Sequence, residues 1–237
     1  MSQALLRGDH HVHSTFSDDA VSTLAQNVGA AVAVGLTTLR LVDHVRQSTT
    51  WVPEYLAAVR QLRVPDGLTV LTGVEAKILD VAGALDIPTL PEGIDRILIA
   101  DHQFPGADGP LGPTAVRERM AAGWDADDVL DQFVEALIAT MRRYPGNQLA
   151  HCFSILPKIG LSEVDLGAQR TDAWARAAAD TDTLVEVNEK WGCPGGDALA
   201  ALRRAGGTLV ASTDSHDASE VGRYSRILPL LDAVEVS

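Results

Sequence analysis

The stretch "GDHHVHSTFSDDA", residues 8–20, holds three histidines and three aspartates within thirteen positions. Such side chains fit poorly on the pleated, half-buried face of a strand, which favours β-branched and aromatic residues. The stretch follows a short apolar run near the N-terminus, and imidazole and carboxylate groups are common metal ligands. We therefore expect it to end the first strand of the fold and to carry part of a metal site.

Outside this stretch, β-rich apolar segments alternate with segments of helical spacing. The expected strands are 4–13, 37–44, 68–75, 95–102, 147–153, 182–189 and 207–216, and the expected helices are 23–36, 53–64, 125–144, 171–180 and 197–206. Alternation of this kind predicts an α/β fold with a parallel sheet. Neither a linker nor a fixed-period repeat is present, so residues 1–237 are expected to form a single domain.

The composition narrows the classes of function. The formal net charge of −13 disfavours attraction to nucleic acid or to an anionic membrane surface. No run of 18 apolar residues occurs, and the N-terminus lacks the pattern of a signal peptide. The two cysteines, Cys152 and Cys193, form no CxxC motif. These features together predict a cytoplasmic protein.

Six of the seven histidines lie at the C-terminal end of an expected strand. The strand ends of a parallel barrel all point to one rim, which brings distant residues together. Two carboxylates at strand ends, Glu75 and Asp214, are expected to join them there. The residues expected to meet at the rim are His11, His13, His44, His102, His151, His216, Glu75 and Asp214.

The spacing of these residues supports a site for several metal ions. Residues i and i+2 of a strand face the same side, so His11 and His13 can share one ion, whereas His10 is expected to face the opposite side. With Asp18 or Asp19 added, the set has about nine ligands, too many for one tetrahedral ion. Two or three divalent ions bridged by carboxylates are therefore expected, and zinc, manganese and iron suit such mixed ligands.

The motifs also resemble those of a known family. "GDHHVHSTFSDD" (8–19) is followed in order by "VDH" (42–44), "TGVE" (72–75), "ADH" (100–102), "AHCF" (150–153), "VEVNE" (185–189) and "STDSH" (212–216). This ordered series is similar to that of the PHP (polymerase and histidinol phosphatase) family. The resemblance implies a distorted (β/α)7 barrel, a metal centre of two or three Zn, Mn or Fe ions at the C-terminal rim of the strands, and hydrolysis of phosphoesters.

Carried over by motif, the resemblance implies a full set of ligands. Glu75 would bridge two ions, and Asp18 matches the Ser-Asp step of the opening motif, with Asp19 left open. The implied metal ligands are His11, His13, Asp18, His44, Glu75, His102, His151, Asp214 and His216.

The expected mechanism is attack on phosphate by a metal-bridging hydroxide. Besides Glu75, the catalytic candidates are Asp214 and His216, either of which would protonate the leaving group. The expected substrate-binding cations are Arg46, Lys77, Lys190 and Arg223. Segment 103–124 is longer than an ordinary βα connection, so it is either a lid over the site or a surface excursion.

Three classes of function compete. The first is a histidinol-phosphatase-like phosphomonoesterase with a small-molecule phosphate ester as substrate, and the single domain with its complete ligand set favours it. The alternative is a phosphodiesterase or nuclease acting on cyclic or oligonucleotide phosphates, which the acidic charge disfavours. The third is a non-catalytic metal-binding domain, against which the complete ligand set argues.

Overall fold

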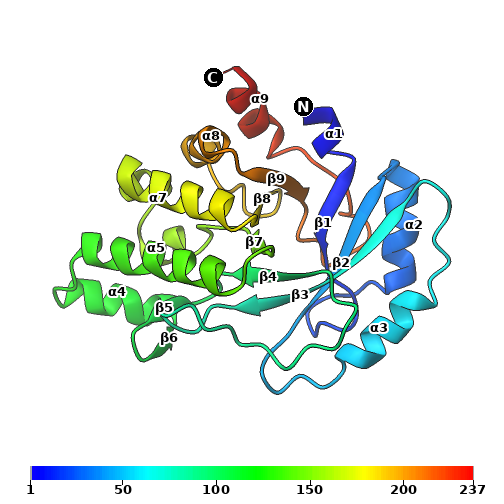
Figure 1. Cartoon of the computed structure of the whole chain (residues 1–237), viewed down its shortest axis with the longest axis horizontal. Coiled ribbons are helices and arrows are strands. Elements are labelled where there is room, and N and C mark those ends of the chain that lie inside the picture. Colours follow the sequence, from blue (N-terminus) through cyan, green and yellow to red (C-terminus); the bar gives the residue numbers. More distant parts are fainter. Residues whose placement is uncertain (1, 237) are drawn as a thin grey trace.

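The computed structural model describes residues 2–236, and within them seven strands form one parallel sheet (Figure 1). Hydrogen-bonded neighbours follow the order β1 (Gly8–Val12), β2 (Thr38–His44), β3 (Thr69–Lys77), β4 (Arg96–Ala100), β7 (Gln148–Ala150), β8 (Leu184–Asn188) and β9 (Thr208–Ser212). Helices connect these strands around the outside, except that residues 78–95, between β3 and β4, form a loop. The predicted (β/α)7 barrel is confirmed.

The barrel is nearly closed between its first and last strands. Val12 bridges to Ser215, and the His13 N–H donates to the Ser215 carbonyl at 2.9 Å. The Asp9 carboxylate accepts from the Thr213 N–H at 3.0 Å and from its hydroxyl at 2.6 Å. These contacts take the place of a regular ladder between β1 and β9.

The helices cover the outer face of the sheet, and a helix also forms each end of the described chain. They are α1 (Ser2–Leu5), α2 (Leu24–Val34), α3 (Val52–Arg60), α4 (Pro113–Ala121), α5 (Ala126–Arg143), α6 (Leu156–Ile159), the 3-10 turn Glu163–Leu166, α7 (Gly167–Asp180), α8 (Gly196–Ala205) and α9 (Leu228–Val236). Thr23 caps α2, and Gly35 ends it in the left-handed region that glycine favours. Leu5 and Leu231 bring α1 and α9 into one apolar cluster. None of the described helices combines the length and hydropathy that crossing a membrane requires.

An apolar layer inside the barrel lies beneath the strand ends. Val42, Leu98, Ala100 and Ala150 form this layer and are almost fully buried. Gly73 belongs to the same level, where a Cβ would lie 3.1 Å from the side chains of both Val42 and Leu98. The glycine thus lets these neighbours fill the barrel, and the packed layer forms a floor under the polar rim.

A register shift occurs in β1 beside His10. Asp9 pairs with Leu39, but Val12 pairs with Leu41, so β1 holds one more residue than β2 across this interval. Such a β-bulge disturbs the alternation of faces. The simple alternation that placed His10 opposite His11 and His13 therefore does not hold across this interval. Burial lowers the pKa of His10 to about 4, and the charge of Arg40 adds to this shift.

Segment 103–124 folds as the hairpin β5 (Phe104–Gly106) and β6 (Gly109–Leu111), followed by α4. Phe104 is buried against Phe133 and Trp124, and Gln132 donates to the Pro105 carbonyl at 2.9 Å. Of this described segment, Gln103 alone lines the cavity at the barrel rim. The structure thus favours the interpretation of this segment as a surface excursion that packs on α5, rather than as a lid.

Candidate metal centre

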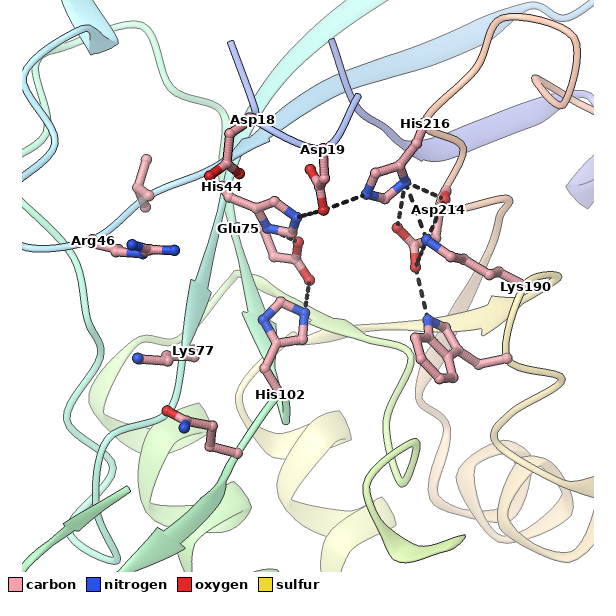
Figure 2. Close-up of a pocket in the computed structure, with 13 residues that line it drawn as sticks. Asp18, Asp19, His44, Arg46, Glu75, Lys77, His102, Lys190, Asp214 and His216 are labelled. Carbon is pink, nitrogen blue, oxygen red and sulfur yellow. Dashed lines mark hydrogen bonds and ion pairs between the residues drawn. The ribbon is translucent and has the colours of Figure 1, made fainter. Parts of the chain in front are cut away.

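The strand ends converge on a cavity of about 480 Å³ at the C-terminal rim of the barrel. Glu75, at 1 % exposure, lies at its base, and the histidines of the neighbouring strands point toward it (Figure 2). The structure brings together all eight residues that strand-end position predicts: His11, His13, His44, His102, His151, His216, Glu75 and Asp214.

The two carboxylate oxygens of Glu75 face different histidines. Oε1 lies 3.1 Å from Nε2 of His102 and 2.9 Å from Nε2 of His151. Oε2 lies 2.8 Å from Nδ1 of His44. Burial raises the pKa of Glu75, but the charges of His102 and His11 outweigh burial and hold this pKa well below its usual range. An ionised carboxylate with its oxygens divided in this way has the form of a bridging ligand.

His11 and His13 face each other through their Nε2 atoms at 2.9 Å. The other ring nitrogens are occupied, because Nδ1 of His11 lies 2.9 Å from Glu186 and Nδ1 of His13 lies 3.3 Å from the Ser17 hydroxyl. Two lone pairs at this distance repel unless a proton or a cation lies between them.

The pKa shifts of the two rings fit a shared proton. Burial lowers the pKa of His11, but the carboxylates of Glu186 and Glu75 raise it well above the usual value. Burial, only partly opposed by Asp214, lowers the pKa of His13 to about 3. One ring therefore holds a proton in the metal-free protein, and a metal ion would replace that proton. The donor set thus fits the ions that the motifs imply.

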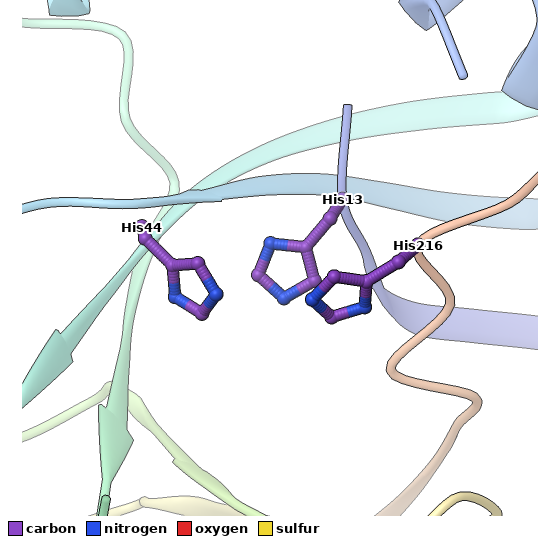
Figure 3. Close-up of side chains that lie close together, drawn as sticks. All are labelled: His13, His44 and His216. Atoms are coloured by element: carbon purple, nitrogen blue, oxygen red, sulfur yellow. The ribbon is translucent and has the colours of Figure 1, made fainter. Parts of the chain in front are cut away.

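Three overlapping groups of side chains place their ligand atoms within 4.8 Å of one another. They are His11, His13 and Asp214; His13, His44 and His216 (Figure 3); and His44, Glu75 and His102. The Asp214 carbonyl lies 3.0 Å from Nδ1 of His216, which leaves Nε2 of that ring for a ligand. Because the groups share members, their geometry suits neighbouring ions better than isolated sites.

Asp19 and Asp18 differ in their contacts although both line the cavity. Oδ2 of Asp19 lies 3.4 Å from Nε2 of His44 and 3.2 Å from Nε2 of His216. Among the described residues, Asp18 forms no ion pair with these histidines. The geometry therefore favours Asp19, the option that the motif left open, as the ninth ligand.

Asp214 is suited to bind a metal ion and poorly suited to donate a proton. Its Oδ1 lies 3.3 Å from Nε2 of His13 and 3.8 Å from Nε2 of His11. Burial raises the pKa of Asp214, but His11 and the hydrogen bond from His13 lower it far below the usual range. The carboxylate therefore stays ionised, so it would not supply the proton for the leaving group.

Two supporting aspartates, Asp43 and Asp101, were not identified as such from the sequence. Asp43 accepts from Ser14 at 2.6 Å and from Ser17 at 2.7 Å through their hydroxyls. Asp101 lies 3.3 Å from Nδ1 of His151. Each directly precedes a histidine in an Asp-His pair, and alternation in a strand turns it away from the ions toward the groups that hold the ligands. The Asp-His pair is therefore the sequence feature from which the two supporting aspartates could have been identified.

Three of the four predicted substrate-binding cations line the cavity, namely Arg46, Lys77 and Lys190. Lys77 pairs with Asp86 at 3.4 Å, which fixes its ammonium group near the cavity wall. Arg223 is exposed and does not line the cavity. The preceding Gly222 N–H binds Asp9 on the outer side of β1, and this contact carries the chain away from the rim.

Comparisons with known proteins agree with this architecture. Residues 9–190 match the family model of the PHP domain. "Probable phosphatase YcdX" of Escherichia coli K12 is 27% identical, covering 96% of this chain and 85% of its own, and the protein of that name from Shigella flexneri serotype 5b matches equally.

A solved structure shares the fold. Histidinol phosphate phosphatase from Lactococcus lactis, complexed with zinc, L-histidinol and phosphate, has a TM-score of 0.67 and 17% identity, with 97% of this chain and 92% of that one covered. Since the family model spans well over half of the sequence, the predicted resemblance is confirmed. The chain belongs to the PHP domain family.

Proposed function

We propose that this protein is a metal-dependent phosphatase that hydrolyses small-molecule phosphate monoesters at the rim of its barrel. The observation that carries the proposal is the buried carboxylate of Glu75, whose two oxygens face histidines from different strands. Membership of the PHP domain family and the names of the relatives support it.

Nine side chains would hold two or three divalent ions, with zinc, manganese and iron as the candidates. They are His11, His13, Asp19, His44, Glu75, His102, His151, Asp214 and His216. When bound, such ions neutralise phosphate charge and supply a nucleophilic water at neutral pH. The free cysteines Cys152 and Cys193 suit a reducing compartment, which supports a cytoplasmic location.

Residues of the chain outside the ligand set would orient the substrate. Arg46 and Lys77 lie on one wall of the cavity, where they would bind the substrate beyond the scissile phosphate (Figure 2). His216 lies at the rim with its side chain 18% exposed, and its Nε2 would bind an ion as one of the nine ligands. A cavity of about 480 Å³ accommodates a small molecule, and the net charge of −13 disfavours a nucleic acid polymer.

A comparison of two chromogenic esters tests the proposal. Protein reconstituted with Zn²⁺ or Mn²⁺ is expected to release phosphate from p-nitrophenyl phosphate and from a panel of small phosphate monoesters. Cleavage of bis-p-nitrophenyl phosphate alone would favour the alternative, a phosphodiesterase or nuclease. Absence of turnover in protein with full metal content would contradict both activities and favour a non-catalytic metal-binding domain.

The role of the cavity cations is tested separately. Arg46→Ala and Lys77→Ala are expected to raise the KM or change substrate preference while leaving metal content intact, because these side chains lie outside the ligand groups. Arg223→Ala, outside the cavity, provides the comparison. Equal KM values in all three variants would show that Arg46 and Lys77 do not bind the substrate.

A further inference from the structure

The two carboxylate oxygens of Asp214 have different surroundings. Oδ1 faces the histidines of the metal centre, 3.3 Å from Nε2 of His13 and 3.7 Å from Nδ1 of His216. Oδ2 accepts the indole N–H of Trp191 at 2.8 Å and lies 3.4 Å from the Lys190 ammonium (Figure 2). One oxygen thus faces the proposed ions, while the other is held from outside.

Trp191 is itself held in place by contacts on several sides. Its backbone N–H donates to Oδ1 of Asn188 at 3.2 Å. The Lys158 ammonium lies 3.9 Å from the centre of its ring. The guanidinium of Arg226 donates to the Lys190 carbonyl at 2.6 Å, which anchors the neighbouring backbone. These contacts fix the direction in which the indole N–H points.

An indole N–H suits this task because of its chemistry. It is a donor only, and it keeps its proton across the working pH range. A carboxylate that could turn about its Cβ–Cγ bond would exchange its two oxygens, whereas one fixed donor on Oδ2 prevents this. The Lys190 ammonium ends a long, flexible stem, whereas the Trp191 ring is held by its own contacts, so the ring fixes Oδ2 more firmly.

We propose that Trp191 is a positioning residue for the metal centre: it holds Oδ2 of Asp214 and thereby presents Oδ1 alone to a metal ion. Residues that hold a ligand from behind typically change metal affinity by roughly 10- to 100-fold when they are removed. The inference rests on the role of Asp214 as a ligand within the proposed function, but it does not depend on which ester is hydrolysed.

The first test compares two Trp→Phe substitutions by metal affinity. Trp191→Phe keeps an aromatic ring and loses the N–H, and Trp124→Phe makes the same change beside the hairpin, outside the ligand groups. Zn²⁺ affinity is measured by competition with a chromogenic chelator. Trp191→Phe is expected to weaken one zinc site roughly 10- to 100-fold, and Trp124→Phe is expected to match the unmodified protein. Wild-type affinity in Trp191→Phe would overturn the inference.

A double-mutant cycle separates positioning from general packing. If Trp191 acts through Asp214, adding Trp191→Phe to Asp214→Asn causes little further loss of zinc affinity. Losses that simply add would show that Trp191 acts independently of Asp214 and would overturn the inference. No ester is used in this cycle, so an inactive protein that still binds zinc would contradict the proposed phosphatase without affecting this test.

A measurement on the unmodified chain covers the case in which Trp191→Phe does not fold. The sequence has four tryptophans, so a ¹⁵N-labelled protein gives four indole N–H signals, which single Phe substitutions of the other three assign by elimination. Addition of Zn²⁺ to metal-free protein is expected to shift the Trp191 signal most. A Trp191 signal that zinc leaves unchanged would rule out the proposed contact.

Discussion

Oε1 of Glu186 lies 2.9 Å from Nδ1 of His11, although the two residues are 175 positions apart in the sequence. Both side chains are fully buried. The contact gives His11 a proton on Nδ1, which leaves Nε2 to face the metal centre. Glu186 also accepts from Gln148 at 2.7 Å, so its position is fixed from a second strand.

Glu186→Gln is expected to weaken metal binding while the fold survives. The amide keeps the shape of the side chain but removes the buried negative charge beside His11, and its NH₂ group would meet the donor of Gln148. Zinc affinity should fall roughly 10- to 100-fold, as measured by chelator competition. Unchanged affinity would show that His11 keeps its tautomer without this carboxylate.

Removal of metal is expected to lower the melting temperature. The proposed ligands come from six strands, so bound ions would stabilise the folded chain and not the unfolded one.

Protein purified without chelator should carry two to three equivalents of metal by elemental analysis, in keeping with the three ligand groups. Identical melting curves before and after chelation, or a single equivalent under metal-replete conditions, would contradict a multinuclear centre.

Glu75→Gln is expected to reduce turnover by orders of magnitude. The substitution removes the charge that offsets repulsion between neighbouring ions, so at least one ion should be lost. Far-UV circular dichroism should stay close to that of the unmodified protein, because the amide has the same shape. Full metal content together with a near-normal kcat would show that Glu75 does not bridge ions.

A matched pair of substitutions distinguishes Asp19 from Asp18. Because Oδ2 of Asp19 lies within 3.4 Å of two histidines, Asp19→Asn should lower both metal content and turnover. Asp18→Asn should leave metal content unchanged, since Asp18 lines the cavity without such a contact among the described residues. The reverse result would restore the assignment that the motif favours.

Glu163 is expected to make stability depend on pH. Burial raises the pKa of Glu163 to about 7, although the Gly195 N–H bonded at 2.7 Å opposes this shift. Below about pH 4.5 both the folded and the unfolded chain are protonated here. Between that value and pH 7 the unfolded chain ionises first, so stability falls as the pH rises through this window.

Glu163→Gln removes this titration and keeps an acceptor for Gly195. In chelated protein, the melting temperature of the variant minus that of the unmodified chain should therefore increase as the pH rises from about 4.5 to 7. A difference between the two proteins that stays constant with pH would show that Glu163 ionises alike in both states.

Several features were predictable from the sequence because they depend on local pattern. Alternating strands and helices indicated a parallel sheet, the resemblance to the PHP family implied that it forms a barrel, and histidines at strand ends indicated the shared rim. Gly35 and Gly206 cap two helices within one residue of their expected ends at 36 and 206. Boundaries shifted where tertiary contacts extend an element, as in α7, which begins at Gly167 rather than at residue 171.

The sequence by itself thus determined the family and the (β/α)7 barrel, through its ordered series of motifs. It also brought eight candidate ligands to one rim, since strand direction places the strand ends together. The tertiary structure decided the rest: the bulge beside His10, the contacts of Asp19 with two histidines, and the contacts of Glu186 and Trp191 with their partners. Each of these depends on strand register or on the path of a loop. Register and loop path follow from packing between segments far apart in the chain, which no local pattern records.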